Sequence, residues 1–472
     1  MTANFKYKKE NKPKPLSVRI PAWVENIDEI ATANKLDGDR MRVLLHQFFL
    51  SYLKNSKLRS GKAGRNFLPE YFPVSSLLLR QTCTDNYIKY VNALIAAGVI
   101  EKRNYDSGKQ SYVVGGHAQL YRWMIPNTYY GGYSFRKEIV SAQKSVNAVL
   151  RTRDKYVKEN NKNALELAKS NPAYIDMLDY FNDLVIIEPG QDEVSAHQIT
   201  SDLKFLECEL LANGDLSWFT MDDFGHRLHH PVATMPKDYR KYLRFKEYLD
   251  QPLAVLDVRN SQPYWSSVIL NKDLINAYLP EFIPLLEHII RFERKPDLLL
   301  YRKLCVEGRL YEFLMEGMGL STKDHETSHK IRDDFKVLFF SSILYSKTRV
   351  FGEKSRFRDS FRMQFPNVHA MFQTIKSMDE TILPELKHII CPAGKKFKHK
   401  NSNDAHKVFP CMMQRIESVM MFQVIAPKLI DAGIRFVTVH DSFILLPQDV
   451  DQALKIVRNS FENLGIPAPT IS

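Results

Sequence analysis

Two aspartates of this chain stand at the ends of apolar, β-rich runs. Asp441 lies between the runs 436–439 and 443–446, and Asp257 closes a run that begins at Leu253. Runs of this composition predict strands. A carboxylate that buried neighbours hold at a strand end is costly unless it meets a cation or a metal. Two such carboxylates in one sheet suit a two-metal site, which clamps the attacking and leaving oxygens of a phosphoryl transfer.

The metal that suits such a pair is Mg²⁺, because Mg²⁺ prefers one or two carboxylates plus substrate phosphates to a cage made by the protein alone. We therefore expect two Mg²⁺ ions, with Mn²⁺ as a substitute. The alternative is that each aspartate is an ordinary turn residue, which is the usual role of an isolated Asp between strands. Spacing alone leaves both interpretations open.

The segment 439–443, Val-His-Asp-Ser-Phe, resembles motif C of the single-subunit right-hand polymerases. This group holds the family A DNA polymerases and the phage and mitochondrial RNA polymerases. In that resemblance Asp257 matches the aspartate of motif A, so Asp257 and Asp441 are expected to bind the metals and to be catalytic. His440 is expected to help place the primer or template. The resemblance covers the C-terminal half of the chain and none of the N-terminal part.

A second segment resembles motif B of the same polymerases, Arg-x3-Lys-x3-Phe-x3-Tyr-Gly. Arg332 and Lys336 are four residues apart and share a helix face. Two cations beside the aspartates hold a triphosphate and neutralise the leaving pyrophosphate. With Phe340 and Tyr345, they are expected to bind the nucleotide.

This match departs from the family in two ways. Tyr345 comes one residue late, and Ser346 stands where the family has Gly. On an ideal helix Tyr345 would point away from Lys336; a π-bulge restores the phase, and otherwise Leu344 occupies that place. The alternative is an amphipathic helix whose apolar residues are only core.

Two more residues are expected to contact primer and template. Asp223-Phe-Gly225-His-Arg227 resembles the Asp/Thr-x-x-Gly-Arg element of the family, with His226 inserted before the arginine. An arginine held by a glycine turn binds phosphate bidentately. Gln414 lies on the helix that precedes motif C and is expected to make polar contacts to the same duplex.

Several histidines offer an alternative, zinc ligation. His229 and His230 lack matching acidic or Cys partners, so a surface or phosphate-facing role is expected for them. Histidines and a cysteine within 388–407 have a spacing that fits no standard zinc site. The lysines of that stretch predict a basic loop that meets nucleic-acid phosphates or water.

The choice of sugar rests on Gln262, five residues after Asp257. In the DNA-synthesising relatives a Glu at that offset screens the ribose 2′-OH, and in the RNA-synthesising relatives the residue is small. Gln262 is nearly as large as Glu, which predicts a preference for dNTPs. Ser442 points the other way, because the DNA enzymes usually have Glu after the motif C aspartate.

The N-terminal region predicts a different activity. Helices are expected at 74–80 and 84–97, a hairpin with a Gly-containing turn over 99–114, and a further strand at 120–124. This order resembles a winged helix-turn-helix, as in plasmid replication initiators and transcription factors. The alternative is a winged helix used for protein contacts. The residues expected to meet DNA phosphates are Lys89, Lys102, Arg103 and Lys109.

Composition agrees with a nucleic-acid partner. The net charge is +12 over 472 residues, and the sequence contains five scattered cysteines. The charge favours a polyanion, and the cysteines suggest reduced thiols in a cytoplasm. Together with the resemblances, this implies the cytoplasm of a bacterial or phage-infected cell. We see no apolar run of about 18 residues and no signal-like start, so no membrane span is expected.

The predicted fold class is α+β: a right-hand polymerase, with an antiparallel palm sheet and helical fingers and thumb, preceded by a winged helix-turn-helix. The expected domains are a basic flexible arm (1–20), a winged-helix module (21–127), a helical thumb-like region (128–213) and a palm (214–472) whose inserted fingers cover about 264–400. Helices are expected in the thumb-like region because the charged segments 136–160 and 164–184 are amphipathic.

The predicted function is that of a template-dependent nucleotidyltransferase acting on DNA template, primer and nucleoside triphosphates as a monomer. A DNA polymerase of a phage, plasmid or mobile element, acting in DNA replication, is the first interpretation. The alternatives are a phage-type single-subunit RNA polymerase and a non-catalytic DNA-binding replication initiator or repressor. The natural template, the primer and the biological process do not follow from the sequence.

Overall fold

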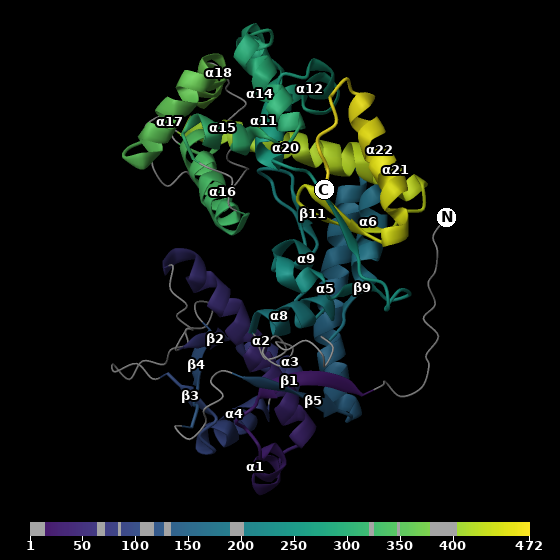
Figure 1. The fold of residues 1–472 in the computed structure, drawn as a ribbon. Helices are drawn as coiled ribbons and strands as arrows, with labels where there is room; N and C mark the ends of the chain where they lie inside the picture. Colours follow the sequence, from purple (N-terminus) through teal and green to yellow (C-terminus); the bar gives the residue numbers. More distant parts are fainter. Residues whose placement is uncertain are drawn as a thin grey trace. The chain divides into compact units, whose positions relative to one another are not determined.

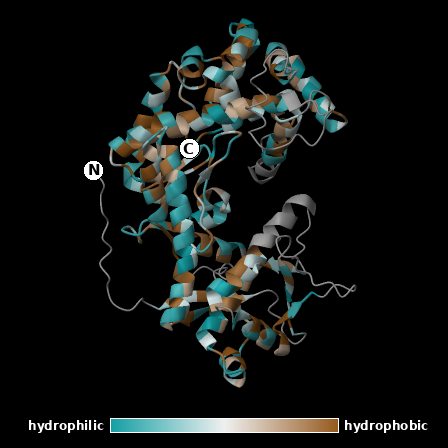
Figure 2. Cartoon of the chain, turned by 180° about the vertical axis from the view of Figure 1, so that it is seen from behind, coloured by the Kyte–Doolittle hydropathy of each residue, from teal (hydrophilic) through white to brown (hydrophobic). Residues whose placement is uncertain are grey.

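The chain is mostly helical with small antiparallel sheets, a mixed α+β structure (Figure 1). This computed structural model describes residues 15–63, 71–83, 86–103, 118–126, 134–188, 203–320, 325–346, 350–377 and 404–472. Four sequence-based predictions lie outside these residues: the arm up to residue 14, the helix start at Thr84, the turn that carries Lys109, and the histidine- and lysine-bearing loop before Asp404. Helices throughout interleave hydrophobic with hydrophilic residues (Figure 2).

The contacts divide the chain into two compact units. The first holds 1–159 and 186–217, and the second holds 160–185 and 218–472. The predicted thumb-like region, 128–213, is therefore shared between the two units. The predicted boundary at 127 also differs from the structure, because the first unit continues beyond it.

In the first unit, the elements follow one another as β1 (Leu16–Pro21), α1 (Ile27–Ala33), α2 (Gly38–Ala63), β2 (Phe72–Val74), α3 (Ser76–Cys83), α4 (Tyr87–Ala96), β3 (Ile100–Lys102), β4 (Gln119–Trp123), β5 (Phe135–Val140), the start of α5 (Gln143–Ala168), and α8 (Leu203–Ala212). One sheet has the order β2-β4-β3, and β1 pairs with β5. Both sheets are antiparallel.

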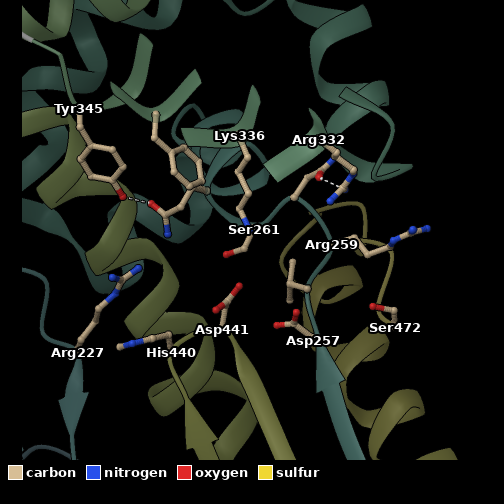
Figure 3. A pocket seen from close by; sticks show the side chains of 14 residues that line it. Arg227, Asp257, Arg259, Ser261, Arg332, Lys336, Tyr345, His440, Asp441 and Ser472 are labelled. Carbon is tan, nitrogen blue, oxygen red and sulfur yellow. Dashed lines mark hydrogen bonds between the residues drawn. The ribbon is translucent and has the colours of Figure 1, made fainter. Parts of the chain in front are cut away.

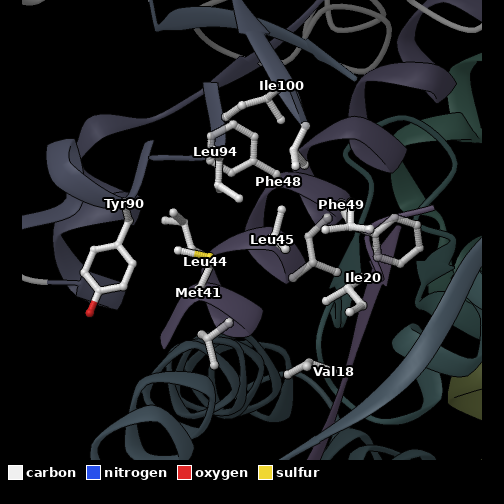
Figure 4. Close-up of a cluster of buried hydrophobic side chains, with 14 of the residues drawn as sticks. Val18, Ile20, Met41, Leu44, Leu45, Phe48, Phe49, Tyr90, Leu94 and Ile100 are labelled. Carbon is white, nitrogen blue, oxygen red and sulfur yellow. The ribbon is translucent and has the colours of Figure 1, made fainter. Parts of the chain in front are cut away.

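The core of this unit forms around α2. Its apolar residues recur at helical spacing, and Leu44, Leu45, Phe48 and Phe49 are fully buried (Figure 4). Residues from β1, α4 and β3 pack against them. Burying one face of α4 in this core leaves its opposite face, with Lys89, exposed.

Two predictions for this unit are wrong. Leu16–Pro21 is not part of a flexible arm, because it forms β1 and pairs with β5 in the register Leu16↔Val140. Residues 135–140 are not helical: they form β5, whose burial alternates along the strand. Of its three charged residues only Lys137 is fully exposed, on the same face as Ile139. Arg136 and Glu138 lie half-buried on the other face, where the Arg136 guanidinium donates to Glu138 at 2.8 Å.

The second unit begins with the end of α5 and then contains α6 (Ala173–Asn182), β6 (Leu184–Ile186), β7 (Thr220–Met221), β8 (Leu228–His229), α9 (Pro231–Thr234), α10 (Lys237–Arg240), β9 (Leu243–Phe245), β10 (Ala254–Asp257) and α11 (Ser261–Val268). Helices follow: α12 (Lys272–Tyr278), η2 (Pro280–Phe282), α13 (Ile283–Ile289), η3 (Ile290–Phe292), α14 (Pro296–Val306), α15 (Leu310–Gly317), α16 (His325–Phe339), η4 (Phe340–Leu344), α17 (Glu353–Gln364) and α18 (Pro366–Ser377). The unit ends with η5 (Asp404–Lys407), α20 (Val408–Ser418), η6 (Val419–Ile425), α21 (Ala426–Asp431), β11 (Phe436–Val439), β12 (Ser442–Leu445), η7 (Pro447–Asp449) and α22 (Val450–Glu462).

Three of these strands form the sheet that matters for the site, in the order β10-β12-β11. The predicted strands are confirmed, and every residue of β11 and β12 is buried. β10 ends at Asp257, and α11 begins only four residues later, with Pro263 in its first turn.

Two long helical stretches are interrupted. Residues 272–292 are divided by Pro280 and Pro284 into α12, η2, α13 and η3. The segment 409–429 passes from α20 into the π-helix η6 and then α21. Among the described residues, no helix has the length and apolar content to cross a membrane.

Candidate active site

The β11–β12 hairpin brings Asp441 to the end of the central strand. Val439 pairs with Ser442, so His440 and Asp441 form a two-residue loop. His440 has φ of 55°, a left-handed conformation that is uncommon for a residue with a side chain. The Ser442 hydroxyl donates to the carbonyl of Val439 at 2.9 Å and ties the loop together.

The register of β10 places the second aspartate beside the first. Asp257 is paired with Ser442 across the sheet, so Asp257 and Asp441 lie at the same edge. Asp257 keeps access to solvent, but desolvation by the surrounding atoms and then the like charge of Asp441 raise the pKa of Asp257 to about 6. Lys237 and Lys336 oppose this shift. Two carboxylates that repel each other in this way gain most from a divalent cation between them.

A pocket of about 360 Å³ opens above this edge. Nine residues predicted from the sequence line it, and Figure 3 shows most of them pointing toward one space: Arg227, Asp257, Gln262, Arg332, Lys336, Phe340, Tyr345, His440 and Asp441. Other lining residues include Asn260, Ser261 and Ser472. The prediction that motifs far apart in sequence share one site agrees with this geometry.

The donor set fits Mg²⁺ better than zinc. Among the described residues, no three His, Cys, Asp or Glu side chains gather in a group that would hold a metal by themselves. Asp257 and Asp441 form a pair of hard oxygen ligands on one sheet edge. Such a pair completes an octahedral shell only with water and substrate phosphates, which is the arrangement that Mg²⁺ favours.

The two motif B cations differ in their surroundings. The Arg332 guanidinium donates to Glu312 at 2.9 Å and to Asn260 at 3.2 Å, so part of its charge is already compensated. Lys336 is exposed, and no described carboxylate lies within ion-pair distance of it. Lys336 is therefore the cation that is ready for an incoming anion.

Tyr345 reaches the pocket because the helix changes its pitch. The segment η4 is π-helical, and the Tyr345 N–H donates to the carbonyl of Phe340 at 2.8 Å, five residues back. The predicted π-bulge is thus confirmed. Tyr345 lines the pocket, whereas Leu344 is fully buried in the core.

A chain of polar contacts runs along one wall. The Tyr345 hydroxyl donates to the side-chain oxygen Oε1 of Gln262 at 2.6 Å, and the side-chain Nε2 of Gln262 donates to the Glu417 carboxylate at 2.8 Å. Glu417 also accepts two bonds of 2.8 Å from the Arg227 guanidinium. Burial raises the pKa of Glu417 to about 7, and the pairing with Arg227 opposes the shift.

Glu417 is the residue that sequence reasoning missed. It lies three residues after Gln414, which does not line the pocket and instead packs against Gly225. A Cβ at Gly225 would lie 2.4 Å from the Gln414 side-chain oxygen, so this position requires glycine. The signal available in the sequence was a single carboxylate in a mostly apolar segment, and in the structure every residue of α20 except Gln414 is buried.

The turn that presents Arg227 also differs from the expected motif. Asp222, not Asp223, accepts backbone bonds from Phe224, Gly225 and Arg227. Burial opposes ionisation of Asp222, but the bonds from His229 and from the backbone lower its pKa to about 2. The inserted His226 adopts φ of 53°, which absorbs the extra residue.

The two neighbouring histidines have structural partners. His229 lies 3.0 Å from the Asp222 carboxylate. His230 is fully buried, and its Nε2 bonds to the carbonyl of Thr438 in β11 at 2.8 Å. The expected surface or phosphate-facing role is therefore wrong for His230.

The last residues of the chain also reach the site. Asp257 and Ser472 exchange two backbone hydrogen bonds, of 2.9 and 3.0 Å, and Arg259 donates to the carbonyl of Thr470. This pairing continues the sheet beyond β10 and fixes the backbone that carries Asp257.

The cations predicted to bind DNA in the N-terminal region lie in the first unit. Lys89 is exposed on α4, and Lys102 ends β3 half-buried. The Arg103 guanidinium lies 5.4 Å from the centre of the Tyr71 ring. Nothing in the described structure tests their role.

No protein-family model matches the chain, and no curated protein matches it. Among solved structures, the chain is similar to the POL domain of Pol1 from M. smegmatis, a family A polymerase domain in complex with DNA primer-template and dNTP. The identity is 14% and the TM-score is 0.30, over 69% of this chain and 65% of that chain. The chain therefore spans somewhat less than two thirds of the length of that domain.

Proposed function

We propose that this protein is a template-directed nucleotidyltransferase of the right-hand polymerase type. One observation carries the proposal: Asp257 and Asp441 share a sheet edge, and Lys336 and Arg332 line the same pocket. Paired carboxylates with cations opposite them suit the transfer of a nucleotidyl group from a triphosphate to a 3′-hydroxyl. In this proposal the sheet β10-β12-β11 is the palm and the helices of 264–400 are the fingers.

Each residue of the site has a role in this reaction. Asp257 and Asp441 hold the two Mg²⁺ ions, which when bound stabilise the charge that develops on the attacking and leaving oxygens. Lys336, exposed and without a described carboxylate partner, binds the phosphates and neutralises the departing pyrophosphate. His440 and Arg227 line the pocket beside Asp441, on the side away from Asp257 (Figure 3). They are proposed to face primer or template.

Gln262 is proposed to select the sugar. Its side chain is held from both ends, by the Tyr345 hydroxyl and by Glu417, and it lines the pocket five residues after Asp257. A side chain fixed in this way cannot swing aside for a 2′-hydroxyl without losing two hydrogen bonds. We therefore propose dNTPs as the preferred substrates.

RNA synthesis is the second candidate, and Ser442 is the observation that favours it. Ser442 follows Asp441 where the DNA-synthesising enzymes have a third carboxylate, and its hydroxyl is committed to Val439. The first experiment therefore compares the incorporation of dNTPs with that of rNTPs.

The first unit is proposed to be a winged-helix DNA-binding module. Its order of helix, strand, helix, helix and two strands, with the sheet order β2-β4-β3, supports this. The exposed face of α4 carries Lys89 and would meet a groove. A DNA-binding module fused to a polymerase suits the replication of a phage, plasmid or mobile element.

Extension of a labelled, primed DNA template with Mg²⁺ tests the proposal, with dNTPs and rNTPs supplied in separate reactions. Template-dependent addition of the complementary nucleotide is the expected result. A protein that binds the duplex but adds no nucleotide of either kind, with Mg²⁺ or Mn²⁺, is instead a non-catalytic initiator or repressor. Omitting the templating base controls for untemplated addition.

A further inference from the structure

The π-helical turn before Tyr345 has an energetic cost. A π-turn contains one residue more than an α-turn, so the carbonyls around it lose their regular partners. Two of them, on Ser342 and Ile343, are buried. A buried carbonyl without a partner costs about 1–3 kcal/mol, so the turn is stable only if other groups donate to these oxygens.

Three side chains supply those donors. The Ser346 hydroxyl donates to the Ser342 carbonyl at 2.6 Å. The Arg358 guanidinium donates twice to the same carbonyl, at 3.2 and 3.1 Å. The Lys376 ammonium donates to the carbonyl of Ile343. The oxygens that the π-turn exposes are therefore satisfied from outside the helix.

Ser346 links the three groups. Its oxygen accepts from Arg358 at 2.7 Å and from Lys376 at 3.3 Å, while its proton goes to Ser342. Arg358 comes from α17 and Lys376 from α18, so one hydroxyl joins two further helices to the turn. Ser346 is also the residue that replaces the Gly of motif B. The two departures from that motif, the extra residue and the serine, thus belong to one arrangement.

Arg358 and Lys376 are cations buried in the protein interior. Lys376 is 1% exposed and Arg358 is 8% exposed. Burial, and then the charge of Arg358, lower the pKa of Lys376 to about 7. An ammonium group this deep is costly, and an apolar side chain would fill the same volume without that cost. Their geometry gives the reason, because both cations donate to the same helical turn.

We infer that Ser346, Arg358 and Lys376 are positioning residues that hold the π-turn and thereby keep Tyr345 bonded to Gln262. The inference rests on the proposed function, since it assigns these buried residues to sugar selection. Without them the helix relaxes toward regular α-helical pitch, and Leu344 rather than Tyr345 turns toward Gln262. None of the three residues lines the pocket, so they act through Tyr345.

The variants Lys376→Met and Ser346→Ala test this, with Arg362→Met as the control. Met is nearly as long as Lys and carries no charge, and Ser346→Ala is the milder change in case the first variant folds poorly. Arg362 lies one turn from Arg358 on α17, and its side chain is 60% exposed in a surface ion pair. The measured quantity is the ratio of kcat/KM for dNTP to kcat/KM for rNTP.

The expected result is a change of about tenfold in this ratio, toward the value measured for Tyr345→Phe. The reason is that Gln262, the gate for the sugar, loses its hydrogen bond from Tyr345. In a Tyr345→Phe background, Lys376→Met should change the ratio no further. A role confined to stability would lower incorporation of both sugars equally, and that outcome, or an effect that adds to Tyr345→Phe, would overturn the inference.

Hydrogen exchange separates this inference from the proposed function. Amides of 340–346 should exchange faster in Lys376→Met and Ser346→Ala than in wild type, with no change in Arg362→Met. Unchanged exchange in both variants would show that the cations do not hold the turn. A wild-type protein that incorporates no nucleotide would refute the polymerase proposal and the gate with it, while the exchange data still decide what holds the turn.

Discussion

His230 makes the stability of the sheet β10-β12-β11 dependent on pH. Its ring is fully buried, Nε2 bonds to Thr438 of β11, and Nδ1 has no described partner. Burial lowers the pKa of His230 from 6.5 to about 3. The folded protein therefore keeps the ring neutral over a range of pH in which the unfolded chain protonates it.

The sign and size of the effect follow from linkage. Between about pH 3 and 6.5 the unfolded state binds more protons, so the free energy of unfolding falls as the pH falls. The stabilisation is fully present above pH 6.5 and is lost progressively toward pH 3. At about pH 5 the loss is about 2 kcal/mol, since each pKa unit is worth about 1.4 kcal/mol.

The variant His230→Gln isolates this contribution. Gln places an amide donor near the position of Nε2 and does not titrate, so all other groups keep their own pH dependence. Urea unfolding, followed by hydrogen exchange of peptides from β11 and β12, should show that wild type loses about 2 kcal/mol more than His230→Gln between about pH 7.5 and 5. His288→Gln, on an exposed position of α13, should behave like wild type. Equal losses in wild type and His230→Gln would refute the reasoning.

Two further predictions concern the pocket, and a third concerns the turn that presents Arg227. Gln262→Gly should raise ribonucleotide incorporation by about tenfold or more with little change for dNTPs, as measured by single-nucleotide addition, because the side chain that crowds the 2′-hydroxyl is gone; a wild-type enzyme that already prefers rNTPs would contradict the gate. The Mg²⁺ concentration for half-maximal activity should be about tenfold higher at pH 5 than at pH 8, because the raised pKa of Asp257, about 6, leaves only about a tenth of it ionised at the lower pH; a constant requirement would argue against Asp257 as a ligand. Gly225→Ala should destabilise the protein by about 1–3 kcal/mol in thermal unfolding, because the new Cβ would lie 2.8 Å from the Gln414 Cβ; Gly433→Ala, where the added Cβ meets nothing but φ is positive, measures the cost of backbone strain alone.

The strands of the site were predictable because local pattern determines them. Apolar runs on either side of Asp441 and before Asp257 predict strands in any context, and their burial in one sheet brings the aspartates together. The π-turn at Tyr345 was predictable for a different reason. A motif with one residue too many needs a wider turn to keep its last member in phase.

Long-range pairing was not predictable in the same way. Glu417 and Arg227 are far apart in sequence, and no local pattern indicates that they form a buried ion pair. Asp222 and Asp223 are adjacent residues of one type, so only the backbone geometry shows which one caps the turn. The strand Phe135–Val140 carries three consecutive charged residues, which do not show the alternation of a strand, and it forms through pairing with β1, more than a hundred residues earlier.

Asp257 and Asp441 together are proposed to hold the metals of nucleotidyl transfer. The most direct test is the single-turnover rate of nucleotide addition by Asp257→Asn and Asp441→Asn, with duplex binding measured on the same samples. Asp250→Asn, which changes a carboxylate outside the pocket lining, is the matched control. We expect each site variant to lose at least about a thousandfold in rate while duplex affinity and the control stay within about twofold of wild type. A rate within about tenfold of wild type in both site variants would contradict the claim.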